Sequence, residues 1–206
     1  MFRLIAYIDG FNLYYGLRES NWRRYYWLDV SALVRRIVKA DQDVVAVKYF
    51  TSRVSSTASD PDKARRQEAY IEALQAQSRV EVFYGHYLQK PMTCRQCGCS
   101  WTVREEKRTD VNIAVEMMTD ALQDHYDVAM LITGDSDLSG VIERLRILYR
   151  DKRIVVVFPP LRVSKRLRQV ASAYFDIRRP ILAKCQLPDA VEKPDGHVLR
   201  RPDSWR

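Results

Sequence analysis

The sequence lacks any apolar stretch long enough to cross a membrane. No hydrophobic run approaches the roughly 20 residues that a transmembrane helix needs. The amino-terminal segment enters a strand-like run without the pattern of a signal peptide. We therefore expect a cytoplasmic protein with no membrane partner.

Histidine and glycine are also scarce. The three histidines, His86, His125 and His197, lie outside the acidic motifs discussed below, so a site built from those motifs would have no imidazole base. The seven glycines form no glycine-rich nucleotide loop. The sequence therefore gives little support to an enzyme acting on a small molecule, an alternative that would require a closed apolar pocket.

Cysteine is present at four positions, three of them clustered. The cluster is Cys94-Arg95-Gln96-Cys97-Gly98-Cys99, and Cys185 lies far along the chain. A secreted disulfide framework is not expected, because nothing marks the chain for export. Cys94, Cys97 and Cys99 could begin a structural zinc site with His86 or Cys185 as fourth ligand. Because a second ligand pair is missing, unligated thiols and a redox or intersubunit role remain open.

Length and charge narrow the class of protein further. With 206 residues, 47% of them hydrophobic, the chain can build one complete core with decorations. Lysine and arginine exceed aspartate and glutamate by 34 to 26, which favours polyanionic partners. The excess is concentrated between residues 144 and 179. This segment contains two acidic residues and the following basic ones: Arg144, Arg146, Arg150, Lys152, Arg153, Arg162, Lys165, Arg166, Arg168, Arg178 and Arg179. This segment predicts a nucleic-acid-binding surface, with simple solubility as the alternative.

Apolar runs of strand length alternate with stretches of helical period. This alternation predicts an α/β fold with a parallel sheet covered by helices on both faces. Strands are expected at residues 3–8, 44–50, 80–84, 128–132, 154–158 and 174–177, and helices at 11–18, 28–38, 61–77, 110–122, 138–148 and 164–173. In the helix at 110–122, the expected apolar face consists of Val111, Ala114, Val115, Met118, Ala121 and Leu122.

Aspartates stand where these predicted elements end or begin. Asp9 closes the first strand, Asp135 and Asp137 follow the strand at 128–132, and Asp110 opens a helix. Ligand sites in parallel sheets lie beyond the carboxyl ends of the strands, where strand order reverses. If the first and fourth strands are neighbours, Asp9, Asp110 and Asp135 converge. Helix capping would explain Asp110 or Asp137 alone, but we do not expect it to explain Asp9 and Asp135 together.

A cluster of carboxylates favours an intervening cation. Adjacent carboxylates repel by roughly 1 to 4 kcal/mol per pair at protein surfaces. Oxygen ligands suit Mg²⁺ or Mn²⁺ better than Zn²⁺. A water bound to such an ion has a lowered pKa and can attack a phosphodiester in line. The acidic motifs therefore predict a metal-dependent hydrolase.

Three ordered motifs carry a family resemblance. They are Ile8-Asp9-Gly10-Phe11-Asn12, Glu106-Lys107-Arg108-Thr109-Asp110-Val111 and Thr133-Gly134-Asp135-Ser136-Asp137-Leu138. In order and spacing they resemble the motifs of NYN domains, which are PIN-like folds related to FLAP nucleases. The resemblance covers residues 3–178, and the cysteine-bearing insert with the later Gln186-Leu187-Pro188 and Arg201-Pro202 pieces is similar to one bacterial branch.

The resemblance implies both an architecture and a domain plan. The fold would be a PIN-like, Rossmannoid three-layer sandwich whose mainly parallel sheet has the order 3-2-1-4-5. Residues 1–178 would form the NYN domain, with an inserted hairpin at about 86–108. Residues 179–206, which contain four prolines, would form an arm laid over the surface.

The resemblance also implies a site and an activity. Asp9, Asp110 and Asp135 would bind the metal, with Asp137 close by, in an enzyme that cleaves or processes RNA. Asn12 would orient a ligand or a phosphate, unless it is only a cap or turn residue. Thr133 and Ser136 would hydrogen-bond the carboxylates or the substrate. Lys165 and Arg166 of the basic segment are assigned to substrate binding.

Two further alternatives remain open from the sequence. Aromatic residues interleaved with arginines follow the first motif, and they could either stack unpaired bases or pack between helices: Tyr14, Tyr15, Trp22, Tyr25, Tyr26 and Trp27. The competing function is a non-catalytic RNA-binding module that keeps the carboxylates for a structural metal. The sequence leaves formation of a homodimer undecided.

Overall fold

The computed structural model describes residues 1–78, 80–94, 96–107 and 109–206, without the side chains of residues 86–91 and 101–107. Six parallel strands form its central sheet, in the order β3-β2-β1-β6-β7-β8. These strands are β1 (Phe2–Asp9), β2 (Gln42–Thr51), β3 (Glu81–Tyr84), β6 (Val128–Ile132), β7 (Arg153–Phe158) and β8 (Ala173–Asp176).

The predicted α/β class is confirmed by this sheet. Counted along the chain, its first five strands follow the expected order 3-2-1-4-5, and β8 adds a sixth strand at the edge. β1 lies directly beside β6, with Ile8 paired to Ile132. The carboxyl ends of these two central strands therefore meet at one edge of the sheet. This is the point at which the order of strands across the sheet reverses.

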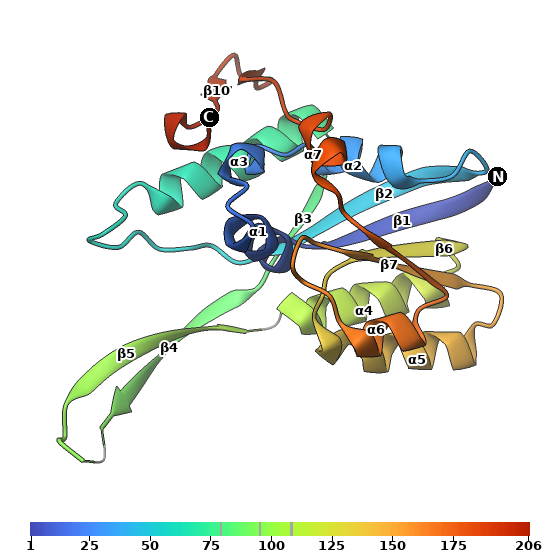
Figure 1. Ribbon diagram of the computed structural model, residues 1–206, viewed down its shortest axis with the longest axis horizontal. Helices are drawn as coiled ribbons and strands as arrows, with labels where there is room; N and C mark the ends of the chain where they lie inside the picture. The colour runs from blue at the N-terminus through green and yellow to red at the C-terminus, as the bar shows by residue number, and fades with distance from the viewer. Residues whose placement is uncertain (79, 95, 108) are drawn as a thin grey trace.

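Helices cover both faces of the sheet, giving three layers (Figure 1). One face carries α1 (Gly10–Glu19), α2 (Val30–Ile37), α3 (Lys63–Ser78) and α7 (Arg179–Ala183), and the other carries α4 (Thr109–Leu122), α5 (Ser139–Leu148) and α6 (Lys165–Val170). Short 3-10 turns are η1 (Arg23–Tyr25), η2 (Ser136–Leu138) and η3 (Asp203–Trp205).

The alternation of side chains along β1 divides the core into two parts. Leu4, Ala6 and Ile8 pack with residues of α1, α2 and α3, whereas Ile5 and Tyr7 pack with residues of α4 and α5. This period of two is what a strand buried on both faces requires. The motif around Asp9 is thus fixed at the end of the most central strand.

The expected apolar face of α4 was wrong in part. Val111, Val115 and Leu122 are 60%, 55% and 74% exposed, while Ile113 and Met117 are fully buried. The helix carries apolar residues around most of its circumference, so periodicity alone could not choose the buried side. A buried polar contact helps to fix which side of α4 faces the sheet, because Asp120 on the inner face accepts hydrogen bonds from Tyr7 and Lys48.

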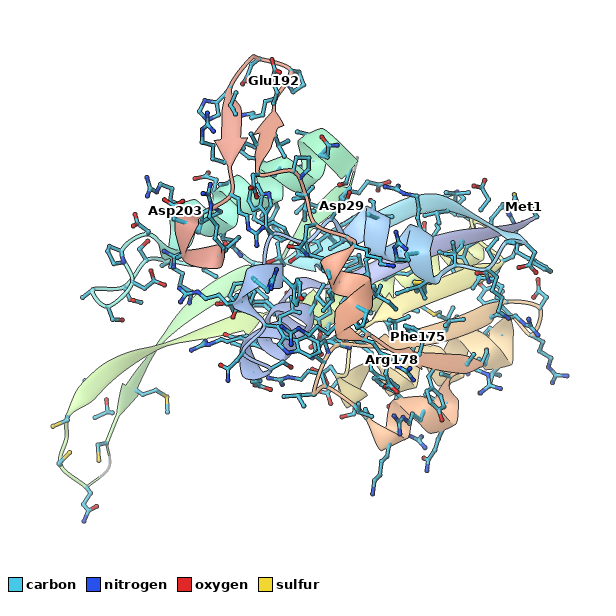
Figure 2. All side chains as sticks on the ribbon, turned by 45° about the horizontal axis from the view of Figure 1, so that its top comes forward. Met1, Asp29, Phe175, Arg178, Glu192 and Asp203 are labelled. Atoms are coloured by element: carbon cyan, nitrogen blue, oxygen red, sulfur yellow. The ribbon has the colours of Figure 1, made fainter. Side chains whose placement is uncertain are left out.

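Two hairpins extend from this core. β4 (His86–Thr93) and β5 (Ser100–Lys107) pair antiparallel and reach away from the sheet (Figure 1). β9 (Ala190–Glu192) and β10 (Val198–Arg200) form a smaller hairpin near α3, with Glu192 toward its tip and Asp203 in the last turn beside α3 (Figure 2). Trp27 Nε1 donates to Pro188 O at 2.7 Å, which fastens this carboxyl-terminal segment to the body. Within the ranges given above, no helix is long and apolar enough to span a membrane.

Candidate functional site

A cleft lies at the sheet edge where β1 and β6 end. Its volume is about 180 Å³. Three of the predicted carboxylates line it, each from a different element: Asp9 at the end of β1, Asp110 in the first turn of α4 and Asp135 in the turn after β6. Asn12 lines the same cleft. The fold thus brings together residues that are up to 126 positions apart in the chain.

Contrary to expectation, helix capping is the local structural role of both Asp9 and Asp135. Asp9 Oδ1 accepts from the backbone nitrogen of Asn12 at 2.9 Å, which caps α1. Asp135 Oδ1 accepts from the backbone nitrogen of Asp137 at 3.0 Å, which caps η2. Each carboxylate has about four lone-pair directions, so one capping bond leaves acceptor capacity for another ligand.

Thr133 links the Asp9 carboxylate to the backbone of Asp135. Its fully buried hydroxyl donates to Asp9 Oδ2 at 3.0 Å and accepts from the backbone nitrogen of Asp135 at 3.1 Å. The prediction that Thr133 bonds a carboxylate therefore agrees with its geometry. Asn12 makes a second link, since its Oδ1 accepts from Gly134 N at 2.8 Å. Its amide oxygen thus tethers the turn after β6 to the first turn of α1.

The donor set fits a hard divalent cation better than a soft one. All three charged groups are carboxylates, and such oxygen ligands suit Mg²⁺ or Mn²⁺. Hydrogen bonds to ligand oxygens are a normal outer support of metal sites. Among the residues described, however, no group of three or more His, Cys, Asp or Glu side chains is close enough to enclose a metal ion directly. A cation here would need bridging waters or small side-chain shifts, which Mg²⁺ tolerates because it keeps several of its waters.

Arg162 is a lining residue that sequence reasoning did not single out. It comes from the loop between β7 and α6, forms an ion pair with Glu19 through Nη2, and lies over the Tyr15 ring at 5.9 Å. Its buried Nε has no hydrogen-bond partner in the described structure. The loop approaches closely because residue 134 is glycine: a Cβ there would lie 2.3 Å from Arg162 O. The Arg162 guanidinium therefore adds one positively charged group to the cleft that the three carboxylates line.

The remaining predicted residues lie outside the cleft lining. Ser136 and Asp137 are exposed on η2, immediately beyond Asp135. Lys165 and Arg166 are exposed at the start of α6, and Arg166 forms an ion pair with Glu143. The basic segment is also less uniform than its composition indicates, because Lys152 is buried, with its ammonium bound to Asp124 and to the carbonyl of Tyr126.

The cysteine cluster sits in the turn between β4 and β5. Cys97 and Cys99 are exposed and Cys94 is half-buried, and all three are free thiols. The backbone closes a tight turn there, with Gly98 N donating to Cys94 O at 2.9 Å and Gly98 at φ 70°. The cysteine side chains take part in no metal-binding group among those described. The side chain of His86, one candidate fourth ligand, lies outside the described residues, and Cys185 is buried in the core.

The aromatic residues after the first motif divide into two groups. Trp27 and Tyr25 are buried in the core. Tyr15 lines the carboxylate cleft and, together with Tyr14 and Tyr26, a second pocket that adjoins it. Packing therefore accounts for Trp27 and Tyr25, and base stacking by the rings that line the two spaces stays a prediction.

Comparisons with known proteins agree with this fold. A model of the NYN domain family matches residues 3–178. The chain is similar to 6-hydroxy-3-succinoylpyridine 3-monooxygenase HspA of Pseudomonas putida, with 28% identity over 98% of this chain and 75% of that protein. Its fold resembles the crystal structure of a Vibrio parahaemolyticus protein of unknown function, with a TM-score of 0.58 and 22% identity over 86% of this chain and 94% of that one.

Proposed function

The chain belongs to the NYN domain family, and we propose that it is a metal-dependent ribonuclease that hydrolyses RNA phosphodiester bonds in the carboxylate cleft. The observation that carries the proposal is the convergence of Asp9, Asp110 and Asp135 on one cleft beside Arg162. Three negative groups suit a divalent cation, and a neighbouring guanidinium suits a phosphate.

Asp9, Asp110 and Asp135 would hold a Mg²⁺ or Mn²⁺ ion, with Asp137 a short distance along the same turn. When bound, such an ion supplies a water of lowered pKa and stabilises negative charge on a phosphate oxygen. The capping bonds and the Thr133 hydroxyl hold the carboxylates of Asp9 and Asp135 in place before any ligand arrives. The protein's own hydrogen bonds thus order two of the three carboxylates, and bridging waters or small side-chain shifts would complete the metal site.

The positive groups would act on the RNA. Arg162 lies within the cleft, where it can donate to a phosphate oxygen and orient the scissile group. Lys165 and Arg166 are exposed on α6, the helix that follows the Arg162 loop, and would attract the backbone on either side. We expect binding through these groups to weaken steeply as salt concentration rises.

The substitution Asp135→Asn separates an enzyme from a binding module. Asparagine keeps the capping function but removes the charge. We expect the variant to bind labelled single-stranded RNA with unchanged or increased affinity and to lose at least about a hundredfold in cleavage rate. Wild-type protein in EDTA serves as the matched metal-free control. RNA binding by the wild type without cleavage in Mg²⁺ or Mn²⁺ would instead indicate a non-catalytic module.

A second candidate function is oxygenation of an aromatic heterocycle. It is favoured by the similarity to the P. putida monooxygenase, which extends over 98% of this chain. A monooxygenase needs an electron donor as well as dioxygen, and the sequence has no glycine-rich dinucleotide loop. Incubation with 6-hydroxy-3-succinoylpyridine, NADH and dioxygen tests it: consumption of the heterocycle with no cleavage of RNA would favour this function over the ribonuclease.

A further inference from the structure

A second pocket adjoins the carboxylate cleft. Its volume is about 100 Å³, and it lies between α1, α3 and the carboxyl-terminal turn η3. Phe11 and Tyr15 line both the pocket and the cleft, so the two spaces share one wall of α1. A molecule that occupied both would pass over these two rings.

Seven of the sixteen residues that line this pocket are aromatic. Tyr14 and Tyr26 have ring centroids 5.0 Å apart, and Tyr26 and Trp205 have centroids 5.7 Å apart at 82°. Tyr70 continues the series at 6.1 Å from Trp205, and its hydroxyl is fixed by donation to Leu28 O at 2.8 Å. Edge-to-face contacts of this kind hold each ring in one orientation. The pocket is therefore a preformed space for a flat apolar group.

Tyr49 links the pocket to the carboxylates. Its buried ring lies against Gly10, the residue that follows Asp9, where a Cβ would approach Tyr49 Cζ to 2.5 Å. A group held against Tyr49 would therefore lie near the metal-binding end of β1.

Size and charge limit what can occupy the pocket. An apolar cavity of about 150 Å³ accommodates benzene, so the smaller space here suits one six-membered ring better than a fused pair. Lys63 and Arg66 of α3 line the same pocket and make it attractive to a group attached to a phosphate. Arg66 is held by both carboxylate oxygens of Asp60, at 2.7 and 2.6 Å. The occupant that meets these conditions is a single-ring base on an anionic backbone.

We infer that this aromatic pocket binds the pyrimidine base of the nucleotide whose phosphate enters the carboxylate cleft. The inference rests on the proposed ribonuclease function and adds to it a preference for cytosine or uracil next to the scissile phosphate. Stacking on aromatic side chains tolerates any base, so the preference for pyrimidines comes from the small volume of the pocket, about 100 Å³.

Calorimetric titration of the intact protein with uridine and adenosine 5′-monophosphates tests the inference without requiring turnover. We expect the uridine nucleotide to bind at least about tenfold more tightly. Val54→Trp adds a large ring at the pocket wall and should lower this affinity at least about tenfold. Val45→Trp adds the same ring at a 47% exposed position outside the pocket and should leave the affinity unchanged.

Thermal unfolding first establishes that the variants are folded. If Val54→Trp does not fold, Trp205→Ala removes a ring from the wall and should lower uridine nucleotide affinity in the same way. Equal affinity for both nucleotides in wild type and pocket variants would overturn the inference. Tighter binding of free 6-hydroxy-3-succinoylpyridine than of either nucleotide would also overturn it.

The outcomes separate this inference from the proposed function. A protein that binds the uridine nucleotide in a Val54-dependent manner but cleaves no RNA would contradict the ribonuclease while supporting the pocket assignment. A protein that cleaves RNA equally after purines and pyrimidines, with no effect of Val54→Trp on nucleotide affinity, would contradict only the pocket assignment.

Discussion

Thr133 and Asp9 are joined by a buried hydrogen bond of 3.0 Å, which crosses from the end of β6 to the end of β1. The same hydroxyl accepts from the backbone nitrogen of Asp135 at 3.1 Å. One side chain therefore sets the relative positions of two carboxylates of the cleft. The bond also satisfies polar groups that would be costly to bury without partners.

Replacement of Thr133 by valine should destabilise the fold and disorder the cleft. Valine has a similar shape but leaves Asp9 Oδ2 and the nitrogen of Asp135 without this partner, which costs about 1 to 3 kcal/mol of unfolding free energy. Thr133→Ser keeps the hydroxyl and should lie closer to wild type. Urea unfolding checks both variants, and a valine variant as stable as the wild type would show that the hydroxyl contributes no stability here.

Gly10 should not tolerate even a methyl side chain. A Cβ at this position would approach the end of the Tyr49 ring to 2.5 Å and Phe50 O to 2.8 Å, neither of which can move freely. We expect Gly10→Ala to cost about 1 to 3 kcal/mol of stability. Gly140→Ala is the matched control, because no atom lies within 4 Å of its added Cβ, and it should be neutral or stabilising by up to about 1 kcal/mol. Similar effects of both substitutions on the unfolding midpoint would contradict this assignment.

Much of the fold could be predicted from the sequence because its strands are short, apolar and clearly separated. The strand at 128–132 was expected with the bounds that β6 has, and the helix expected at 28–38 contains α2. The orientation of α4 could not be predicted, because Val111 and Val115 are as apolar as the buried Ile113 and Met117. Selecting between the two faces depends on the sheet residues against which the helix packs.

The candidate site was only partly accessible to sequence reasoning. The motif order predicted which aspartates would meet at the sheet edge, since strand order fixes their positions. The capping bonds of Asp9 and Asp135 depend on local backbone angles, which the pattern of residue types does not specify. Arg162 was one of eleven basic residues in its segment, and only the close approach of its loop to Gly134 distinguishes it.

The buried cluster around Asp120 should make stability depend on acid pH. Burial alone would raise the pKa of Asp120, but hydrogen bonds from Lys48, Tyr7 and His125 outweigh burial and lower it below the ordinary 3.8. A carboxylate with a lowered pKa in the folded state stabilises the fold above the unfolded pKa and loses that contribution as pH falls through the folded pKa. Stability should therefore fall below about pH 4.

Asp120→Asn isolates the contribution of that carboxylate. The substitution weakens the partnership with the buried Lys48, which lies 2.7 Å from both Asp120 and Glu116, and should cost about 3 kcal/mol near neutral pH. The difference between wild type and variant should shrink as pH falls from 5 toward 2. A difference that stays constant across guanidinium unfolding curves in this range would show that Asp120 makes no ionic contribution.

The cysteines should react at two distinct rates. Cys94, Cys97 and Cys99 lie in the hairpin turn, whereas Cys185 is 1% exposed and burial raises the pKa of its thiol. Since the thiolate is the reactive form, Ellman's reagent should modify three groups rapidly and the fourth only on unfolding. Three protected hairpin thiols in native protein, together with about one zinc ion per chain released by a chelator, would instead establish the zinc site.

The central claim is that RNA is cleaved in the carboxylate cleft. A comparison of the cleavage rates of the Asp9→Asn and Asp29→Asn variants tests it most directly. Both aspartates are helix N-caps with 2.9 Å bonds, to the nitrogens of Asn12 and Ala32. Asp9 lines the cleft, whereas Asp29, labelled in Figure 2, caps α2 and is not among the residues that line the cleft. Asparagine preserves either cap, so the two variants differ in whether a cleft charge is lost.

The measurement is the initial rate of cleavage of labelled single-stranded RNA in Mn²⁺. We predict that Asp29→Asn cleaves at the wild-type rate and that Asp9→Asn falls at least about a hundredfold, to the level of wild type in EDTA. Equal rates for the two variants, or cleavage by the wild type that persists in EDTA, would contradict the account.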